Sequence, residues 1–118
     1  MKIPGLDHPI TIEPAAEHVT VRVAGQVVAD TTAALVLREA TLPPVYYIPI
    51  ADVDPSLITA SDTHTYCPYK GQASYYDVAT STGVIKDAIW AYEEPYPAVG
   101  EIADHVAFYP SRVEIIAA

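Results

Sequence analysis

The sequence predicts a mainly β protein: one compact antiparallel domain of about eight short strands, bent to close on one core, with one or two short helical turns. Three observations predict this class. Apolar and polar residues alternate in several segments, β-branched and aromatic residues are concentrated in those segments, and eleven prolines interrupt the chain before a long helix could form. Since 118 residues is close to the commonest domain size, we expect a single domain over residues 1–118.

The first half of the chain contains four expected strands. Valines alternate with polar residues in 18–23, which is typical of a half-buried strand, and the turn at 24–26 makes 27–31 its hairpin partner. Residues 34–39 favour a third strand over a turn and a half of helix, because prolines follow closely. Residues 45–50 contain a proline that cannot donate to a ladder, so this strand lies at an edge or bends there.

The second half begins with a short helical turn or loop at 52–58. A polar stretch at 59–65 then leads into a tight turn at 66–71, where a proline presets φ and a glycine tolerates a positive φ. Residues 73–79 and 84–92 are expected to form a second hairpin.

The strand predicted at 84–92 is apolar on both alternating sets, so we expect it to be buried on both faces. One set is Ile85, Ile89 and Ala91, and the other is Ala88, Trp90 and Tyr92. Residues 98–104 predict one helical turn, and 106–109 and 112–116 predict the last two strands.

Charge and cysteine content exclude several classes of function. The net charge is −9, and the six basic residues are scattered singly, so we expect no binding to nucleic acid or to an anionic membrane. Cys67 is the only cysteine and the histidines are far apart, so we expect no disulfide and no metal site. No apolar run approaches the ~20 residues that span a bilayer, and Met1–Gly5 does not read as a signal peptide, so a cytosolic (cytoplasmic) location is expected.

Four motifs follow one another along the chain: Tyr47-x-Pro49-x-x-Asp52-Val53, Cys67-Pro68-x-Lys70-Gly71-x-Ala73-x-Tyr75, Trp90-x-Tyr92-x-x-Pro95, and Val106-Ala107-Phe108-Tyr109. Together they resemble the bacterial and fungal family called domain of unknown function 427 (DUF427), over roughly Val19 to Ile116. The resemblance implies a β-tent-like fold of antiparallel strands. It implies no established activity, although the family has also been labelled nucleotidyltransferase-like.

The segment around Cys67 is one candidate for chemistry. Lys70 stands three residues after Cys67 in the predicted turn, and a nearby ammonium favours the nucleophilic thiolate. His64, His105 or a carboxylate would then be the partner base, and a small buried thiol is the alternative. Lys70 and Gly71 could also hold an anion, or Lys70 could be an ordinary surface lysine.

The aromatic residues are the second candidate. Trp90 and Tyr92 share a strand face, and with Tyr75 or Tyr47 they could form a wall for a planar ligand. Core packing explains the same residues equally well.

The pair Asp52-x-Asp54 is the feature that could support the nucleotidyltransferase label, because two carboxylates on one face could hold Mg²⁺. No Gly-Ser element precedes the pair, however, and Pro55 follows it. An aspartate in this position is more typical of a helix cap or an Asx-turn.

Two hypotheses remain from the sequence. The first is a small-molecule-binding domain, with Cys67 as nucleophile if a reaction occurs, whose ligand-binding residues are Tyr47, Asp52, Lys70, Gly71, Tyr75, Trp90 and Tyr92. The second is an interaction module that self-associates, for example as a homodimer through an edge strand or a tyrosine patch. The sequence identifies no cofactor.

Overall fold

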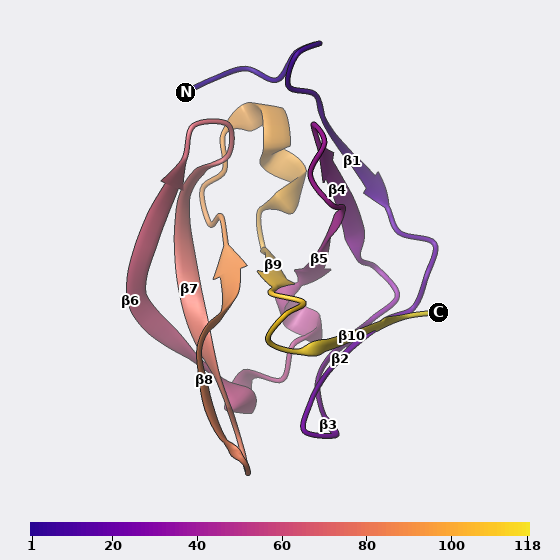
Figure 1. Cartoon of the computed structure of the whole chain (residues 1–118), viewed down its shortest axis with the longest axis vertical. Helices are drawn as coiled ribbons and strands as arrows, with labels where there is room; N and C mark the ends of the chain where they lie inside the picture. The colour runs from indigo at the N-terminus through magenta and orange to yellow at the C-terminus, as the bar shows by residue number, and fades with distance from the viewer.

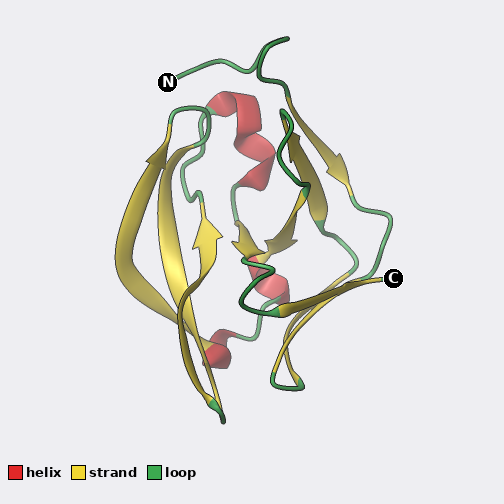
Figure 2. Ribbon diagram, in the orientation of Figure 1, coloured by secondary structure: helices red, strands yellow, loops and turns green.

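Ten strands and three short 3-10 turns make up the computed structural model, which describes residues 1–118 (Figures 1 and 2). The mainly β class is therefore confirmed. The strands are β1 (Ile10–Pro14), β2 (Val19–Val23), β3 (Gln26–Thr31), β4 (Leu35–Glu39), β5 (Val45–Pro49), β6 (Ile58–Cys67), β7 (Gly71–Thr80), β8 (Gly83–Ala91), β9 (His105–Phe108) and β10 (Glu114–Ala117). The turns are η1 (Ile50–Asp52), η2 (Pro55–Leu57) and η3 (Pro97–Ile102). None of the three has the length and apolarity that a membrane-spanning helix requires.

The strands form two antiparallel sheets. The larger sheet has the order β1-β4-β5-β9-β8-β7-β6, and the smaller has the order β10-β2-β3. Figure 1 shows that the larger sheet curls, so that its edge strands β6 and β1 lie on opposite sides of the molecule with η3 between them at one end. This curl is what brings side chains from the two ends of the sheet toward a common interior.

The interior consists of two cores, whereas the sequence predicted one. The alternation along β5 shows why: Ile48 packs into the first core, and its neighbour Tyr47 packs into the second, on the other face of the strand. The first core also takes Val19 and Val21 from β2, so it lies between the two sheets. The second core is enclosed by the curled sheet and by η3, which contributes Val99 and Ile102.

Strand β8 is buried on both faces only from Ala88 onward; in its first half Val84 and Lys86 are exposed, so the prediction of burial on both faces holds for the second half alone. Ile89 and Ala91 belong to the first core, and Trp90 packs against the second. Ala88 was expected on the side of Trp90, but it lies in the first core. Asp87 has φ +52°, in the left-handed region, and the β7–β8 register shifts at this point, so the simple two-residue alternation is broken there.

Two strands were missed in the sequence. Residues 59–65 form most of β6, whose polar composition reflects its place at the edge of the large sheet, where its side chains are largely exposed. β1, which begins after Pro9 and ends at Pro14, is the opposite edge strand. The sequence predicted that the strand containing Pro49 either lies at a sheet edge or bends at this proline. The edge position is wrong, because β5 lies between β4 and β9. The chain leaves the sheet at Pro49 to form η1.

The predicted hairpin turns are present. Ala24 and Gly25 connect β2 to β3 with φ of +51° and +78°, the left-handed conformation that two-residue hairpin turns favour. The turn between β6 and β7 is closed by a hydrogen bond from the backbone N–H of Lys70 to the carbonyl oxygen of Cys67, 3.3 Å. This second turn carries the residues considered next.

Candidate functional site

The turn between β6 and β7 directs Lys70 into the protein rather than into solvent. The side chain of Lys70 is 9% exposed, and its ammonium forms an ion pair with the carboxylate of Glu39, at the end of β4. Glu39 also accepts a hydrogen bond from Nε2 of His8 at 2.8 Å, and Nζ of Lys70 lies 3.8 Å from Sγ of Cys67. We call Glu39, His8, Lys70 and Cys67 the Lys70 cluster. It joins the N-terminal segment, β4 and the β6–β7 turn.

The charges within the Lys70 cluster are mutually compensated. Burial alone would raise the pKa of Glu39, but hydrogen bonds and charge from Lys70 and His8 outweigh it and lower the pKa below 4.5. Glu39 is therefore ionised at neutral pH and neutralises the ammonium of Lys70. Lys70, which the sequence suggested could bind an anionic ligand, is therefore already paired with Glu39.

A group of aromatic side chains continues from the Lys70 cluster into the second core. Nε1 of Trp90 donates to the hydroxyl of Tyr47 at 3.2 Å, and the two rings meet edge to face. Tyr109 lies against Trp90 with ring centres 4.4 Å apart, and the hydroxyls of Tyr75 and Thr65 are 2.8 Å apart. The ring of Tyr92 lies 5.8 Å from Nζ of Lys70. We call Tyr47, Tyr75, Trp90, Tyr92 and Tyr109 the aromatic cluster.

The phenols of Tyr47, Tyr92 and Tyr109 stay protonated over the whole physiological range. Burial raises the pKa of Tyr47 far above 10, with a further contribution from Glu39, although the hydrogen bond from Trp90 opposes the shift. Burial and then the neighbouring Tyr47 raise the pKa of Tyr92 in the same direction. Burial, with hydrogen bonding to Tyr75, raises the pKa of Tyr109 to about 12. These hydroxyls are neutral groups that can donate hydrogen bonds.

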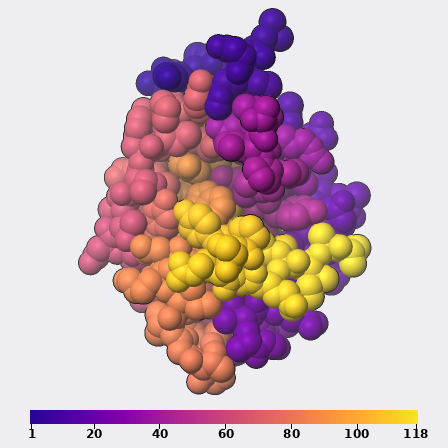
Figure 3. Space-filling view, viewed as in Figure 1, coloured from indigo at the N-terminus to yellow at the C-terminus, as the bar shows by residue number.

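An apolar groove opens over the ring of Trp90. Its volume is about 490 Å³, inside the range of about 300–1,000 Å³ that is typical of small-molecule sites. We call it the Trp90 groove, and it is lined by Leu42, Pro43, Pro44, Val45, Tyr46, Trp90, Phe108, Pro110 and Ile115. In Figure 3 the surface is hollowed between the purple-magenta atoms near residues 42–46 and the yellow atoms of the C-terminal segment. Trp90 therefore belongs both to this groove and to the aromatic cluster.

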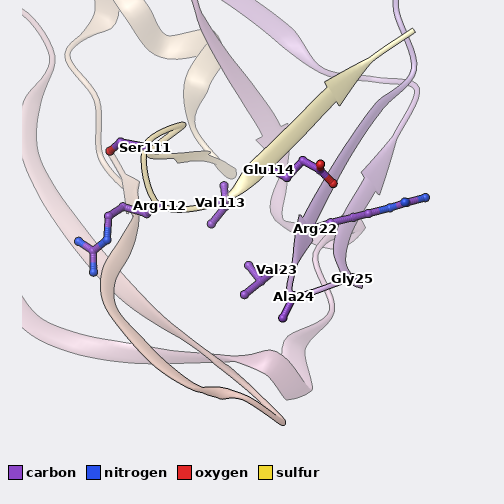
Figure 4. Close-up of a pocket in the computed structure, with 8 residues that line it drawn as sticks. All are labelled: Arg22, Val23, Ala24, Gly25, Ser111, Arg112, Val113 and Glu114. Carbon is purple, nitrogen blue, oxygen red and sulfur yellow. The ribbon is translucent and has the colours of Figure 1, made fainter.

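A second hollow of about 490 Å³ lies beside the β2–β3 turn and contains two of the six basic residues. Figure 4 shows that Arg22 and Arg112 point away from each other and from the space between them. Because the guanidinium groups do not converge, this hollow does not form an anion site.

The curled sheet brings six of the predicted site residues together. Tyr47, Cys67, Lys70, Tyr75, Trp90 and Tyr92 all border the second core or lie in contact with residues that do. Gly71 is adjacent to them, and its role is to allow the backbone conformation of the turn. Its φ is +110°, and a Cβ there would lie 3.5 Å from the carbonyl oxygen of Glu94. The sequence predicted such a conformation for this glycine.

Asp52 lies elsewhere. It belongs to η1, and its carboxylate accepts a hydrogen bond of 2.7 Å from the hydroxyl of Thr31, on β3. Asp54 caps η2 by accepting from the backbone N–H of Ser56 at 3.0 Å. The capping interpretation of Asp54 is thus confirmed, and the geometry gives these two carboxylates separate structural partners.

Glu39, His8 and Tyr109 were missed. A signal for Glu39 was present, because Leu35, Leu37 and Glu39 alternate on one face of the predicted strand, and a carboxylate that continues an apolar face points inward. A similar signal was present for Tyr109, because it follows Ala107, which lies in the second core, by two residues along the predicted strand. His8 had no such signal, since its position depends on how the N-terminal segment crosses the sheet.

A family model described as "Domain of unknown function (DUF427)" matches residues 11–118, nearly the whole chain. No curated protein is significantly similar to the chain.

Proposed function

The chain belongs to this DUF427 family, whose description assigns no activity, and we propose that it is a small-molecule-binding domain whose ligand lies in the Trp90 groove. The observation that carries the proposal is the double role of Trp90. Its ring lines an apolar groove of about 490 Å³, while its N–H is held by the buried hydroxyl of Tyr47. Small-molecule sites typically combine apolar walls with a few convergent polar groups, and Trp90 connects the two here.

The position of Trp90 is fixed before any ligand arrives. Tyr47 is 1% exposed and makes an edge-to-face contact with the indole, and Tyr109 packs against the indole as well. Tyr75 is the direct cross-strand neighbour of Trp90 in the β7–β8 pairing. A ring held on several sides loses little entropy when a ligand stacks on it, which favours binding.

The Lys70 cluster has a supporting role in this proposal. The ion pair between Lys70 and Glu39 ties the β6–β7 turn to β4, across the two ends of the curled sheet. Cys67 contributes the only thiol near the aromatic cluster, and it is the nucleophile in the version of the proposal that includes a reaction. Asp52 is not part of the proposed site.

Native mass spectrometry of the protein, purified without added ligand from the cells that naturally contain it, tests the proposal. We expect a mass above that of the chain, which is lost on heating and absent from a Trp90→Leu variant. Tyr66→Leu is the matched control, because Tyr66 is an aromatic residue 59% exposed on β6, away from the groove. A bare chain for wild type and control alike would contradict the proposal.

Self-association is the second candidate function, and one observation favours it. β6 is a ten-residue edge strand with exposed side chains, including Tyr66, whose hydroxyl bonds that of Tyr96 at 2.7 Å. Against it, the middle of β6 is irregular: the backbone N–H of Thr63 bonds Oγ of Ser61 at 3.1 Å, so this N–H is not free to pair with another strand. Sedimentation velocity of wild type and Tyr66→Asp decides the matter, since a β6 dimer predicts a monomeric variant.

A further inference from the structure

The hydrogen-bond donors on the walls of the Trp90 groove are already engaged by the protein. Seven of its nine lining residues have side chains made only of carbon and hydrogen, and the two exceptions are Tyr46 and Trp90. Nε1 of Trp90 donates to the hydroxyl of Tyr47 at 3.2 Å, and the hydroxyl of Tyr46 donates to Oε2 of Glu17, also at 3.2 Å. Each of these groups has a single proton to donate. The side chains of the groove therefore offer no free donor to a carbonyl or carboxylate oxygen of a ligand.

No charged side chain lines the Trp90 groove. The two charged groups that act on the pKa of Tyr46 have opposite signs: burial and then Glu17 raise this pKa, and Arg38 opposes them. A charged ligand would lose hydration on entering the groove and would gain no counter-charge from its walls. An uncharged ligand has no such loss, so the charge distribution favours it.

The walls of the groove also have a fixed shape. Three of the lining residues are prolines, whose rings restrict the backbone. The indole of Trp90 is held by Tyr47 and Tyr109, and Phe108 is 2% exposed and anchored in the first core. Walls that are ordered in advance lose little entropy on binding, and aromatic walls favour a flat ring that stacks on them or meets them edge to face.

We infer that the ligand class of the proposed site is a flat, uncharged molecule of hydrocarbon character, which the Trp90 groove recognises by apolar contact, without an ion pair or a donated side-chain hydrogen bond. This inference rests on the proposed function, since it names the kind of molecule that occupies the groove. The affinity comes from the apolar surface that ligand and groove remove from water. No covalent step is required.

Toluene, benzoate and benzylammonium are matched probes, because they share the phenyl ring and differ in charge. Titration of each into the ¹⁵N-labelled protein is followed by NMR through the indole N–H of Trp90, the only tryptophan. We expect toluene to bind at least about tenfold more tightly than either ion, a difference of roughly 1.4 kcal/mol. The reason is that only the ions lose hydration without a partner in the groove.

A substitution on the groove wall locates the binding. Leu42 is 59% exposed and lines the groove, so Leu42→Ser should fold normally and remove part of the apolar wall. We expect this variant to bind toluene about twofold to tenfold more weakly, because less apolar surface leaves water. Leu6→Ser is the matched control: it is the same substitution at a fully exposed leucine outside the groove, and it should leave toluene binding unchanged.

The outcomes separate this inference from the proposed function. If benzoate or benzylammonium binds as tightly as toluene, the groove accepts charge, and the ligand class is wrong while the proposed function stands. If Leu42→Ser has no effect, toluene does not occupy the groove, and the inference fails as well. If no probe shifts the Trp90 resonance, the ligand class is also overturned, and the native mass spectrum decides the proposed function independently.

Discussion

Replacing Glu39 with glutamine tests whether the Lys70 cluster holds the curled sheet together. The side chains of Glu39 and Lys70 are 12% and 9% exposed, so the substitution leaves a nearly buried ammonium without its counter-charge. Breaking a buried pair by removing one partner typically destabilises a protein by about 3–5 kcal/mol, because the remaining charge has lost both water and partner. We expect Glu39→Gln to lower the free energy of unfolding by an amount in this range.

Urea denaturation followed by the fluorescence of Trp90 measures this change directly, since Trp90 lies beside the second core. Lys86→Gln is the matched control: Lys86 also pairs with a carboxylate, that of Asp77 at 3.4 Å, but its side chain is 71% exposed. Exposed pairs contribute about 0–1 kcal/mol. The double variant Glu39→Gln/Lys70→Met should recover much of the lost stability, because it removes both charges.

The pH dependence follows from the lowered pKa of Glu39. Since this pKa is lower in the folded state than the ordinary 4.5, the ionised carboxylate stabilises the fold above pH 4.5, and the stabilisation is lost as the pH falls through the folded value. The wild type should therefore lose more stability than Glu39→Gln when the pH is lowered from neutral through this region. If Glu39→Gln is no less stable at neutral pH than Lys86→Gln, the reasoning about the buried pair is refuted.

Three further predictions concern the same region. Gly71→Ala should destabilise the fold by about 1–3 kcal/mol, because φ at this position is +110° and a Cβ would approach the Glu94 carbonyl, whereas Gly100→Ala, with open space and no positive φ, should differ by less than about 0.5 kcal/mol in the same urea titration. Tyr47→Phe removes the acceptor of the Trp90 N–H and should destabilise the fold by about 1–3 kcal/mol, with a change in Trp90 emission; unchanged stability and emission would contradict the contact. Native Cys67 should react with iodoacetamide, because it is partly exposed, and labelling that occurs only after unfolding would eliminate it as a nucleophile.

Local pattern predicted most of the strands and both hairpins. Alternation identified β2 and β3, and the glycines at the turns identified the connections, because these features depend on neighbours in sequence. β6 was missed since an edge strand exposed to solvent need not alternate. The break in alternation at Asp87 could not be predicted either, because a bulge arises from the mismatch between two strands and not from one strand alone.

The candidate site was predicted in its residues better than in its interactions. The strand and turn motifs singled out Lys70, Trp90 and Tyr92, and the curl of the sheet brings them to one interior. The partner of Lys70 came from β4, which is distant in sequence, so its identity depended on the sheet order. Glu39 changes the chemistry of the candidate site, because it pairs with the ammonium of Lys70, which an anionic ligand would otherwise have used.

A crystal structure of the protein, purified from its own cells without added ligand, tests the central claim most directly. We predict electron density for a flat molecule in the Trp90 groove, stacked on the ring of Trp90. A groove that contains only ordered water, in protein that has not been unfolded or extensively dialysed, would contradict the claim that this chain is a small-molecule-binding domain.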